Sequence, residues 1–298
     1  MIKNFSELEN IAKVNESKRV VVAMAEEADV LKAVSEAAAA DIIVPILVGN
    51  KSAIKNAAKS ADVNVDSFRI IESDGEKNCA AKAVELIRNK EADCLMKGKT
   101  STAYIMKAVL NKEKGLRGSG VLSHVAILNP PTYHKLLLMT DSALNIAPEL
   151  KDKIAITENA LTVARKLGIE QPKVAVVGAV EKVNPSMPAT IDAAALSKMA
   201  DRGQIKNCMI DGPFALDNAI SAKSCEIKGI KTEVGGDADV LLFPDIEAAN
   251  VFYKSLAYLT DYPMAGLIVG ADVPIILTSR SDSDEIKYFS ILAGVSLV

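Results

Sequence analysis

The alternation of short apolar runs with longer helical patterns constrains this chain most. Runs such as Lys173–Val177 and Val240–Phe243 are apolar at consecutive positions, which is typical of strands buried on both faces. Segments such as Glu27–Ala40 and Glu76–Asn89 lie between such runs and carry apolar residues at helical spacing. Buried strands that alternate with helices predict an α/β fold around a mostly parallel sheet.

The same pattern predicts the individual elements along the chain. The expected strands are Arg19–Met24, Ile42–Val48, Phe68–Ile71, Asp93–Met96, Val121–Leu128, Lys135–Thr140, Lys173–Val177, Asn207–Ile210, Val240–Phe243, Gly266–Val269 and Val273–Leu277. The expected helices are Glu27–Ala40, Glu76–Asn89, Ser101–Asn111, Pro148–Leu167, Pro188–Arg202 and Glu247–Tyr258, with a helix-like N-terminus (Met1–Asn10) and a further helix closing the chain.

One stretch departs from the alternation and suggests a division of the chain. Two apolar runs are joined directly by the turn residues Asn129–Thr132, which favours a strand pair that can be antiparallel. The long helix expected after them has the character of a domain crossover. We therefore predict one domain formed by residues 1–142 and 262–298 and a second formed by residues 143–261.

Composition excludes several function classes. The 298 residues include 35 basic and 38 acidic side chains, a net charge of −3, which argues against a surface for nucleic acid or an anionic membrane. No apolar run approaches the ~18 residues of a membrane span, and no secretory leader is visible, so a cytoplasmic location is expected. The four cysteines are far apart without a CxxC pair, which argues against a zinc site. The two histidines, His124 and His134, lie on scattered apolar segments and favour structural roles.

Ligands of open α/β sheets bind beyond the carboxyl ends of strands, so the residues that follow each strand matter most. The first such segment is Lys97–Ser101, which ends like a phosphate loop, although Asp93 stands where that loop requires glycine. Free amides at a helix N-terminus, together with Lys97, Lys99 and Thr100, would hold a phosphate group. The alternative is a Thr/Ser helix cap flanked by solvated lysines.

The second segment is glycine-rich and carries a guanidinium. Three glycines within Gly115–Gly120 permit a close approach of the backbone to a ligand, and Arg117 would donate to a phosphate in a bidentate manner. Ser123 follows and is a further candidate for substrate binding. The alternative is a flexible connector with an exposed arginine.

Three more strand ends carry carboxylates. Asp141 and Asn145 follow one strand, and either orient a ligand or cap a turn. Asp211 and Asp245 follow two others, where they would bind a metal ion or a ribose hydroxyl, or cap the next helix.

The last strand end suits acyl transfer. Thr278–Glu285 places hydroxyls, a guanidinium and carboxylates within eight residues. Ser279 and Arg280 would stabilise a developing oxyanion, and a carboxylate would take up a proton. The alternative is a helix N-terminus whose acidic first turn complements the helix dipole.

Three sequence segments together carry a resemblance to a known family. The run VLLFPDIEAANVFYK (Val240–Lys254), the segment LTSRSDSDE (Leu277–Glu285) and the segment LMTDSALN (Leu138–Asn145) resemble the phosphate acyltransferases, which comprise phosphate acetyl- and butyryltransferases. The resemblance covers nearly the whole chain. The butyryl branch is the better match, because the acetyl enzymes typically carry Asp-Leu-Ser-Arg-Gly where this chain has Leu277–Ser281.

This resemblance implies a fold and a reaction. The implied fold is a two-domain α/β architecture similar to isocitrate and isopropylmalate dehydrogenases, with the active site in the interdomain cleft. The implied reaction converts a short-chain acyl-CoA and inorganic phosphate into an acyl phosphate and CoA, without a metal and with CoA as substrate rather than cofactor. Because the chain is rich in apolar helices, we also expect a homo-oligomer.

The resemblance also implies residue roles. Ser279 and Arg280 match the family's Ser and Arg at the reacting centre. The family's basic Asp falls at Ile286 without a gap and at Glu285 with a one-residue gap, so Glu285 is the implied base and Asp284 the other candidate. A further family Arg falls at about Tyr258, and Arg117 with the lysines near Gly98 would then compensate.

Other functions are compatible with parts of the pattern. Within the family, a phosphate acetyltransferase is the alternative to the butyryl enzyme. A related decarboxylating dehydrogenase would need a cluster of metal-binding aspartates and an adenosine pocket, and neither is visible. A non-catalytic protein that binds CoA or acyl phosphate would bind CoA yet release no thiol from butyryl-CoA and phosphate.

Overall fold

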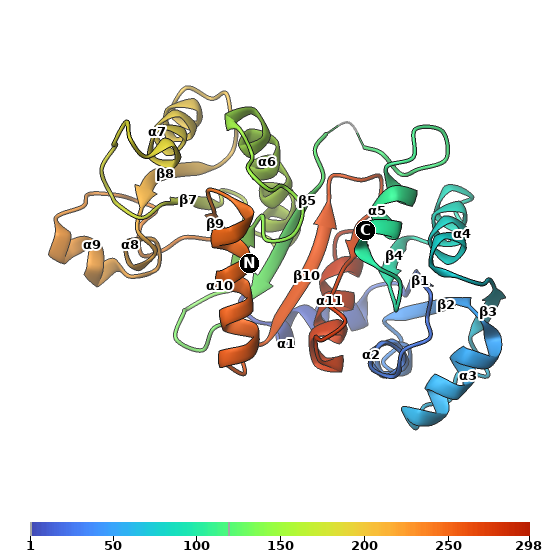
Figure 1. Ribbon diagram of the computed structural model, residues 1–298. Coiled ribbons are helices and arrows are strands. Elements are labelled where there is room, and N and C mark those ends of the chain that lie inside the picture. Colours follow the sequence, from blue (N-terminus) through green and yellow to red (C-terminus); the bar gives the residue numbers. More distant parts are fainter. Residues whose placement is uncertain (1, 119) are drawn as a thin grey trace. The chain divides into compact units, whose positions relative to one another are not determined.

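The chain forms a mixed α/β structure in the computed structural model, which describes residues 2–118 and 120–298 (Figure 1). Contacts along the chain divide it into two compact units. The N/C unit comprises Phe5–Gly120 and Pro263–Val298, and the mid-chain unit comprises residues 2–4 and Val121–Tyr262. Within the described residues, no helix combines the length and apolarity needed to cross a membrane.

The N/C unit is built on a sheet with strand order β3-β2-β1-β4-β11-β10. All its pairs are parallel except β10 with β11. Its strands are β1 (Lys18–Ala23), β2 (Ile43–Gly49), β3 (Arg69–Glu72), β4 (Cys94–Lys97), β10 (Met264–Val269) and β11 (Ile275–Ile276).

Helices cover both faces of this sheet. They are α1 (Phe5–Val14), α2 (Ala28–Ala39), α3 (Lys51–Ser60), α4 (Glu76–Arg88), α5 (Thr102–Val109) and α11 (Asp284–Val295). Helices α2 and α11 pack together on one face, and α4 and α5 pack together on the other (Figure 1). Because both faces are covered, the successive residues Val20, Val21 and Val22 of β1 are all fully buried.

The mid-chain unit has strand order β5-β6-β9-β7-β8. The first two strands pair antiparallel and the others parallel. Its strands are β5 (Ser123–Leu128), β6 (Leu137–Thr140), β7 (Lys173–Val177), β8 (Met209–Phe214) and β9 (Val240–Leu242). Its helices are α6 (Leu150–Lys166), α7 (Pro188–Asp201), α8 (Leu216–Ile220), α9 (Ala222–Lys228) and α10 (Ile246–Leu259).

The strand predictions are confirmed, and most differ from the structure only at their ends. The strand expected at Asn207–Ile210 runs on to Phe214, and the pair β5–β6 is antiparallel with Ala126 opposite Met139. Helices α3, α8 and α9 were not expected. Helix α3 is short and mostly polar, with only Ile54 and Ala58 buried, so the apolar stripe that would mark it in the sequence is very small.

The compact units and the predicted domains place their last boundary one residue apart, after residue 262 and after residue 261, but they differ over residues 2–4 and 121–142. In the structure the latter segment forms β5 and β6, and β6 pairs in parallel with β9, which places it in the mid-chain unit. The prediction assigned these two strands to the first domain and the helix that follows them to the second. In the structure the strands and helix α6 belong to the same unit. The domain division at residue 142 itself stays a prediction.

An ion-pair cluster lies at the amino ends of the mid-chain strands. The Lys135 ammonium, 6% exposed, lies 2.6 Å from the Asp239 carboxylate and 2.9 Å from that of Asp237. Asp237 also accepts hydrogen bonds from Lys173 (2.6 Å) and His134 (2.7 Å). Burial opposes ionisation of Asp237, but the hydrogen bonds from Lys173, Lys135 and His134 outweigh it and hold the pKa of this carboxyl well below its usual range.

We predict that this cluster makes stability depend on acid pH. Because the Asp237 carboxyl has a lower pKa in the folded than in the unfolded chain, its stabilisation is present above about pH 4 and declines as the pH falls. Asp237→Asn should lower the free energy of unfolding by about 1 kcal/mol at pH 7, since the group is partly exposed. Urea unfolding at pH 7 and at pH 2 should show the gap from wild type narrowing in acid.

The matched control is Asp261→Asn, which changes an exposed carboxyl that makes no hydrogen bond or ion pair with the described residues. It should leave the free energy of unfolding unchanged at both pH values. An equal loss for Asp237→Asn at pH 7 and pH 2 would show that its charge does not contribute.

Candidate active site

The end of strand β4 carries a buried ammonium. Lys97 is the last residue of β4 and only 4% exposed. Its Nζ donates to the backbone carbonyls of Gly98 (3.1 Å) and Thr100 (3.5 Å), both in the turn before α5. Burial lowers the pKa of Lys97, and the nearby Glu27 carboxylate opposes that effect. A cation therefore lies at the strand end where ligands of such sheets bind.

The turn after Lys97 requires glycine. The amides of Gly98 and Lys99 donate to the carbonyls of Ala23 (2.9 Å) and Met24 (2.8 Å) at the end of β1. A Cβ on residue 98 would lie 2.8 Å from the Ala23 oxygen and closer still to that of Met24. The β4 turn is therefore pressed against the end of β1.

The Glu76 carboxylate lies at the N-terminus of α5, where the sequence predicts free amides that would hold an anion. Its Oε2 accepts from the Ser101 amide (2.5 Å) and from the Thr100 hydroxyl (3.5 Å). The Ser101 amide, followed by other hydrogen bonds and by Arg280, lowers the pKa of Glu76. Thr100 is fully buried in this contact, whereas Lys99 is exposed. One amide of this N-terminus, that of Ser101, therefore already donates to a carboxylate, and the phosphate contacts of Lys97, Lys99 and Thr100 stay predictions.

The Ser279–Arg280 turn leaves the sheet beside the β4 turn. Strand β11 pairs in parallel with β4, with Ile276 opposite Met96, so both strands end at the same edge. The Ser279 amide donates to the Asp282 carboxylate (2.7 Å), and its hydroxyl contacts that of Ser281 (3.0 Å).

Arg280 lies close to the groups of the β4 turn. Its guanidinium is exposed and lies 4.0 Å from the Glu76 carboxylate. Its charge also contributes to lowering the pKa of Lys97, after burial. Arg280 and Lys97 therefore form a pair of cations at one sheet edge, with an exposed side toward solvent.

The two candidate bases lie in the first turn of α11. Ser283 caps this helix by accepting from the Ile286 amide (3.2 Å). The Asp284 carboxylate lies 4.0 Å from Lys32 of α2, and Glu285 is exposed. Burial first, and then the carboxylates of Glu9, Asp284 and Glu285, raise the pKa of Glu36 on α2. Both candidates therefore lie near α2, and the assignment of the base stays a prediction.

The glycine-rich segment is fixed to a neighbouring loop. Arg117 forms an isolated antiparallel bridge with Ala271, and the Leu116 carbonyl accepts from the Asp272 amide (3.0 Å). A Cβ on Gly118 would collide with the Gly270 carbonyl, which explains one of the three glycines. The Arg117 side chain is exposed, and Ser119 of this motif lies outside the described residues.

The two remaining predicted residues belong to the mid-chain unit. Ser123 is fully buried at the start of β5, where its hydroxyl accepts from Asn159 (2.9 Å). Asp245 caps α10 by accepting from the Ala248 amide (2.8 Å). Both side chains have structural partners here, and their substrate contacts stay predictions.

The turn after β6 is closed by its own side chains. The Asp141 carboxylate accepts from the amides of Ala143 (2.9 Å) and Leu144 (3.1 Å) and from the Asn145 side chain (2.6 Å). These contacts are those of the capping alternative. Nearby, the ring of His124 is buried and contacts the Ser142 hydroxyl (2.9 Å), and this burial lowers its pKa.

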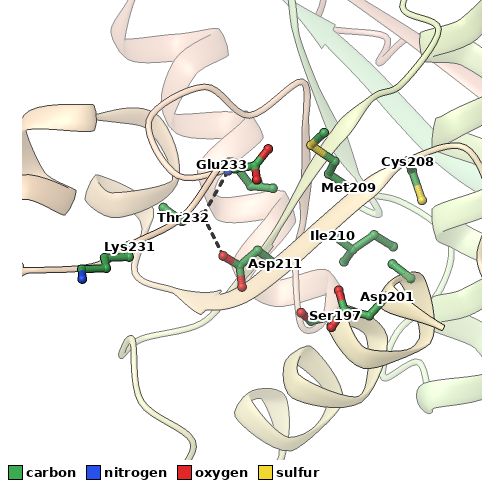
Figure 2. Close-up of a pocket in the computed structure, with 11 residues that line it drawn as sticks. Ser197, Asp201, Cys208, Met209, Ile210, Asp211, Lys231, Thr232 and Glu233 are labelled. Atoms are coloured by element: carbon green, nitrogen blue, oxygen red, sulfur yellow. Dashed lines mark hydrogen bonds between the residues drawn. The ribbon is translucent and has the colours of Figure 1, made fainter. Parts of the chain in front are cut away.

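Figure 2 shows a cavity of about 640 Å³ in the mid-chain unit, between α7, β8 and residues 231–234. Asp211 lines it and accepts from the Thr232 hydroxyl (2.6 Å) and the Gly212 amide (2.8 Å). None of the predicted catalytic residues lines this cavity. Among the described residues, no group of three or more His, Cys, Asp or Glu side chains is arranged to hold a metal ion.

Sequence patterns missed the acidic partners of this sheet edge. Glu27 and Glu76 were read only as residues at the start of helices, and Lys287 as part of the closing helix. The roles of these three residues depend on contacts between segments far apart in the chain, such as that of Glu76 with Ser101 and that of Lys287 with Glu27. For Lys287 the sequence does offer a signal, because it stands four positions before the apolar Ile291 and therefore on the same side of α11.

Comparison with known proteins decides the family. A family model described as phosphate acetyl/butaryl transferase matches residues 5–82 and 76–294. The chain belongs to this family. Its resemblance to phosphate acyltransferases is thereby confirmed, and as a family member the chain is an acyltransferase.

Individual phosphate acyltransferases are similar over nearly the full length. A phosphate butyryltransferase of Clostridium acetobutylicum is 48% identical, covering 98% of this chain and 97% of that protein. A phosphate acetyltransferase of Thermotoga maritima is 42% identical, covering 92% and 93% respectively. The crystal structure of a branched-chain phosphotransacylase from Enterococcus faecalis is similar with a TM-score of 0.83, at 32% identity, covering 94% of this chain and 98% of that one.

We predict that Gly98→Ala strains the β4 turn of this acyltransferase. The added methyl group would meet the carbonyls of Ala23 and Met24, so the end of β1 must shift. The free energy of unfolding, measured by urea titration, should fall by about 1–3 kcal/mol. The control is Gly178→Ala, where the nearest atoms lie at 3.9 Å and the change should be less than about 0.5 kcal/mol. Equal effects of the two substitutions would contradict the close approach.

Proposed function

We propose that the protein is a phosphate butyryltransferase that catalyses butyryl-CoA + phosphate ⇌ butyryl phosphate + CoA. The observation that carries the proposal is the pair of cations, Lys97 and Arg280, beside the Ser279 hydroxyl at one sheet edge. Such a group suits a small anion that must approach an acyl carbonyl. The similarity to butyryltransferases over nearly the full chain supports the choice of substrate class.

In the proposed mechanism, inorganic phosphate attacks the thioester carbonyl directly. Lys97 and Arg280, with Arg117 as a further donor, hold the phosphate and offset its charge. Ser279 donates a hydrogen bond to the carbonyl oxygen as negative charge develops there. A phosphate oxygen forms the new bond to carbon, the carbon–sulfur bond breaks, and CoA leaves as the thiolate.

The proton then comes from a carboxyl group. We assign this role to Glu285, with Asp284 as the other candidate, and in the reverse direction the carboxylate removes the thiol proton. A CoA thiolate is a good leaving group, so positioning and electrostatic stabilisation supply most of the acceleration. Neither a metal ion nor a resident cofactor is part of this scheme, and neither is a covalent acyl-enzyme.

Further parts of the proposal concern the arrangement and setting of the enzyme. Thr100, Lys99, Ser123 and Asp245 remain candidate substrate contacts. The dehydrogenase-like two-domain arrangement, the cleft position of the active site and the cytoplasmic location stay predictions. Self-association also stays a prediction, and exposed Val251 and Leu259 on α10 support it.

An acyl-chain series tests the substrate assignment. Thiol release from acetyl-, propionyl-, butyryl- and longer acyl-CoA with phosphate should reach its highest kcat/KM at four carbons. A maximum at two carbons would support a phosphate acetyltransferase, the name of relatives such as the Thermotoga maritima enzyme. CoA binding with no thiol release from any member of the series would identify a non-catalytic binding protein and overturn the proposal.

We predict that Arg280→Ala strongly reduces turnover. Loss of its guanidinium removes charge stabilisation from the attacking phosphate, and the rate of thiol release should fall by a factor on the order of 10²–10³. The control is Arg202→Ala, which changes an exposed arginine at the end of α7 and should keep the wild-type rate. Near-normal turnover by Arg280→Ala would show that this assignment is wrong.

A further inference from the structure

Lys287 is a buried lysine that the proposed mechanism does not use. It lies in the first turns of α11 and is only 1% exposed. Lysine is almost never fully buried unless its ammonium has partners. Its Nζ donates to the backbone carbonyl of Asp282 and lies 3.5 Å from Glu27 Oε1.

The first of these contacts reaches the Ser279–Arg280 turn. Asp282 is 4% exposed and closes that turn from both directions. Its carboxylate accepts from the Ser279 amide (2.7 Å), and its own amide donates to the Ser279 carbonyl (3.3 Å). A donor that holds the Asp282 carbonyl therefore fixes the far end of the turn that carries Ser279 and Arg280.

The second contact reaches the end of β1. Glu27 stands at the start of α2 but does not cap that helix with its side chain. Among the described residues its Oε1 is buried and makes no hydrogen bond, so the ion pair with Lys287 is its compensation. Because β1 pairs with β4, with Ala23 opposite Lys97, Glu27 also lies near the Lys97 ammonium and favours its charged form.

We propose that Lys287 is a positioning residue of the phosphate site: it ties the Ser279–Asp282 turn to Glu27 beside Lys97, without touching substrate. This inference rests on the proposed phosphate acyltransfer. Its function would be to hold the Ser279 hydroxyl and the Arg280 guanidinium in place before phosphate arrives. A displacement of about 1 Å at such a group can cost about 100-fold in rate.

The test compares Lys287→Met with the double variant Glu27→Gln/Lys287→Met. The single variant removes the tether and leaves Glu27 as an uncompensated buried charge, so both thermal stability and kcat/KM for phosphate should fall, the latter about 10- to 100-fold. The double variant removes the unpaired charge and should regain thermal stability. Its kcat/KM for phosphate should stay low, because the Asp282 carbonyl still lacks its donor.

A purely structural role predicts a different result. Activity would then recover together with stability in the double variant, which would overturn the proposal. Lys153→Met is the matched control, since Lys153 is also a buried lysine (5% exposed) paired with a carboxylate, Asp192 at 2.6 Å, in the mid-chain unit. It should lower stability and leave the KM for phosphate unchanged.

Calorimetric titration with inorganic phosphate separates failure of this inference from failure of the proposed function. If the wild type is active and Lys287→Met has the same kinetic constants, only the positioning role is overturned. A wild type that binds phosphate but releases no thiol would overturn the acyltransfer. In that case the positioning role stands if Lys287→Met and the double variant bind phosphate at least tenfold more weakly than the wild type. It falls if they bind phosphate as tightly as the wild type. A wild type that binds no phosphate would overturn both.

Discussion

The parallel pairing of β4 with β1 on one side and β11 on the other is the constraint on which the candidate site depends. Because the three strands run in the same direction, the segments that follow them leave the sheet at one edge. Glu27 follows β1, the Lys97–Thr100 turn follows β4, and the Ser279–Asp282 turn follows β11. Residues more than 250 positions apart in the chain, such as Glu27 and Asp282, thereby become neighbours. Gly98 permits the closest of these approaches.

The charges gathered at this edge would not be stable without one another. Lys97 and Lys287 are almost completely buried, and a buried ammonium is costly unless carbonyls or carboxylates compensate it. Backbone carbonyls of the two turns and the Glu27 carboxylate supply that compensation. Arg280 differs because its guanidinium is exposed and comes no closer than 4.0 Å to the Glu76 carboxylate. It is therefore available to an incoming anion. The site therefore combines two mostly buried ammonium groups, which carbonyls and a carboxylate compensate, with one exposed guanidinium.

The sequence predicted the strands well because a strand buried on both faces is apolar at every position. It also placed Lys97, Ser279 and Arg280 at strand ends, since each follows directly on such a run. It could not show that the Glu76 carboxylate accepts a hydrogen bond from the Ser101 amide, because that contact joins the start of α4 to the start of α5. Helix α3 was missed for its polarity, and Asp141 and Asn145 prove to close their own turn. Local patterns thus locate the sheet edge, while the pairing of charges across it needs the structure.

Family membership and local geometry support the same account from different directions. The match to phosphate acyltransferases fixes the class of enzyme, and the sheet edge of the N/C unit supplies cations and a hydroxyl suited to phosphate and an acyl carbonyl. The most direct test is a crystal structure determined with inorganic phosphate. The account predicts a phosphate ion within hydrogen-bond distance of both Lys97 Nζ and the Arg280 guanidinium. A phosphate bound elsewhere, with Lys97 still held only by the Gly98 and Thr100 carbonyls, would contradict it.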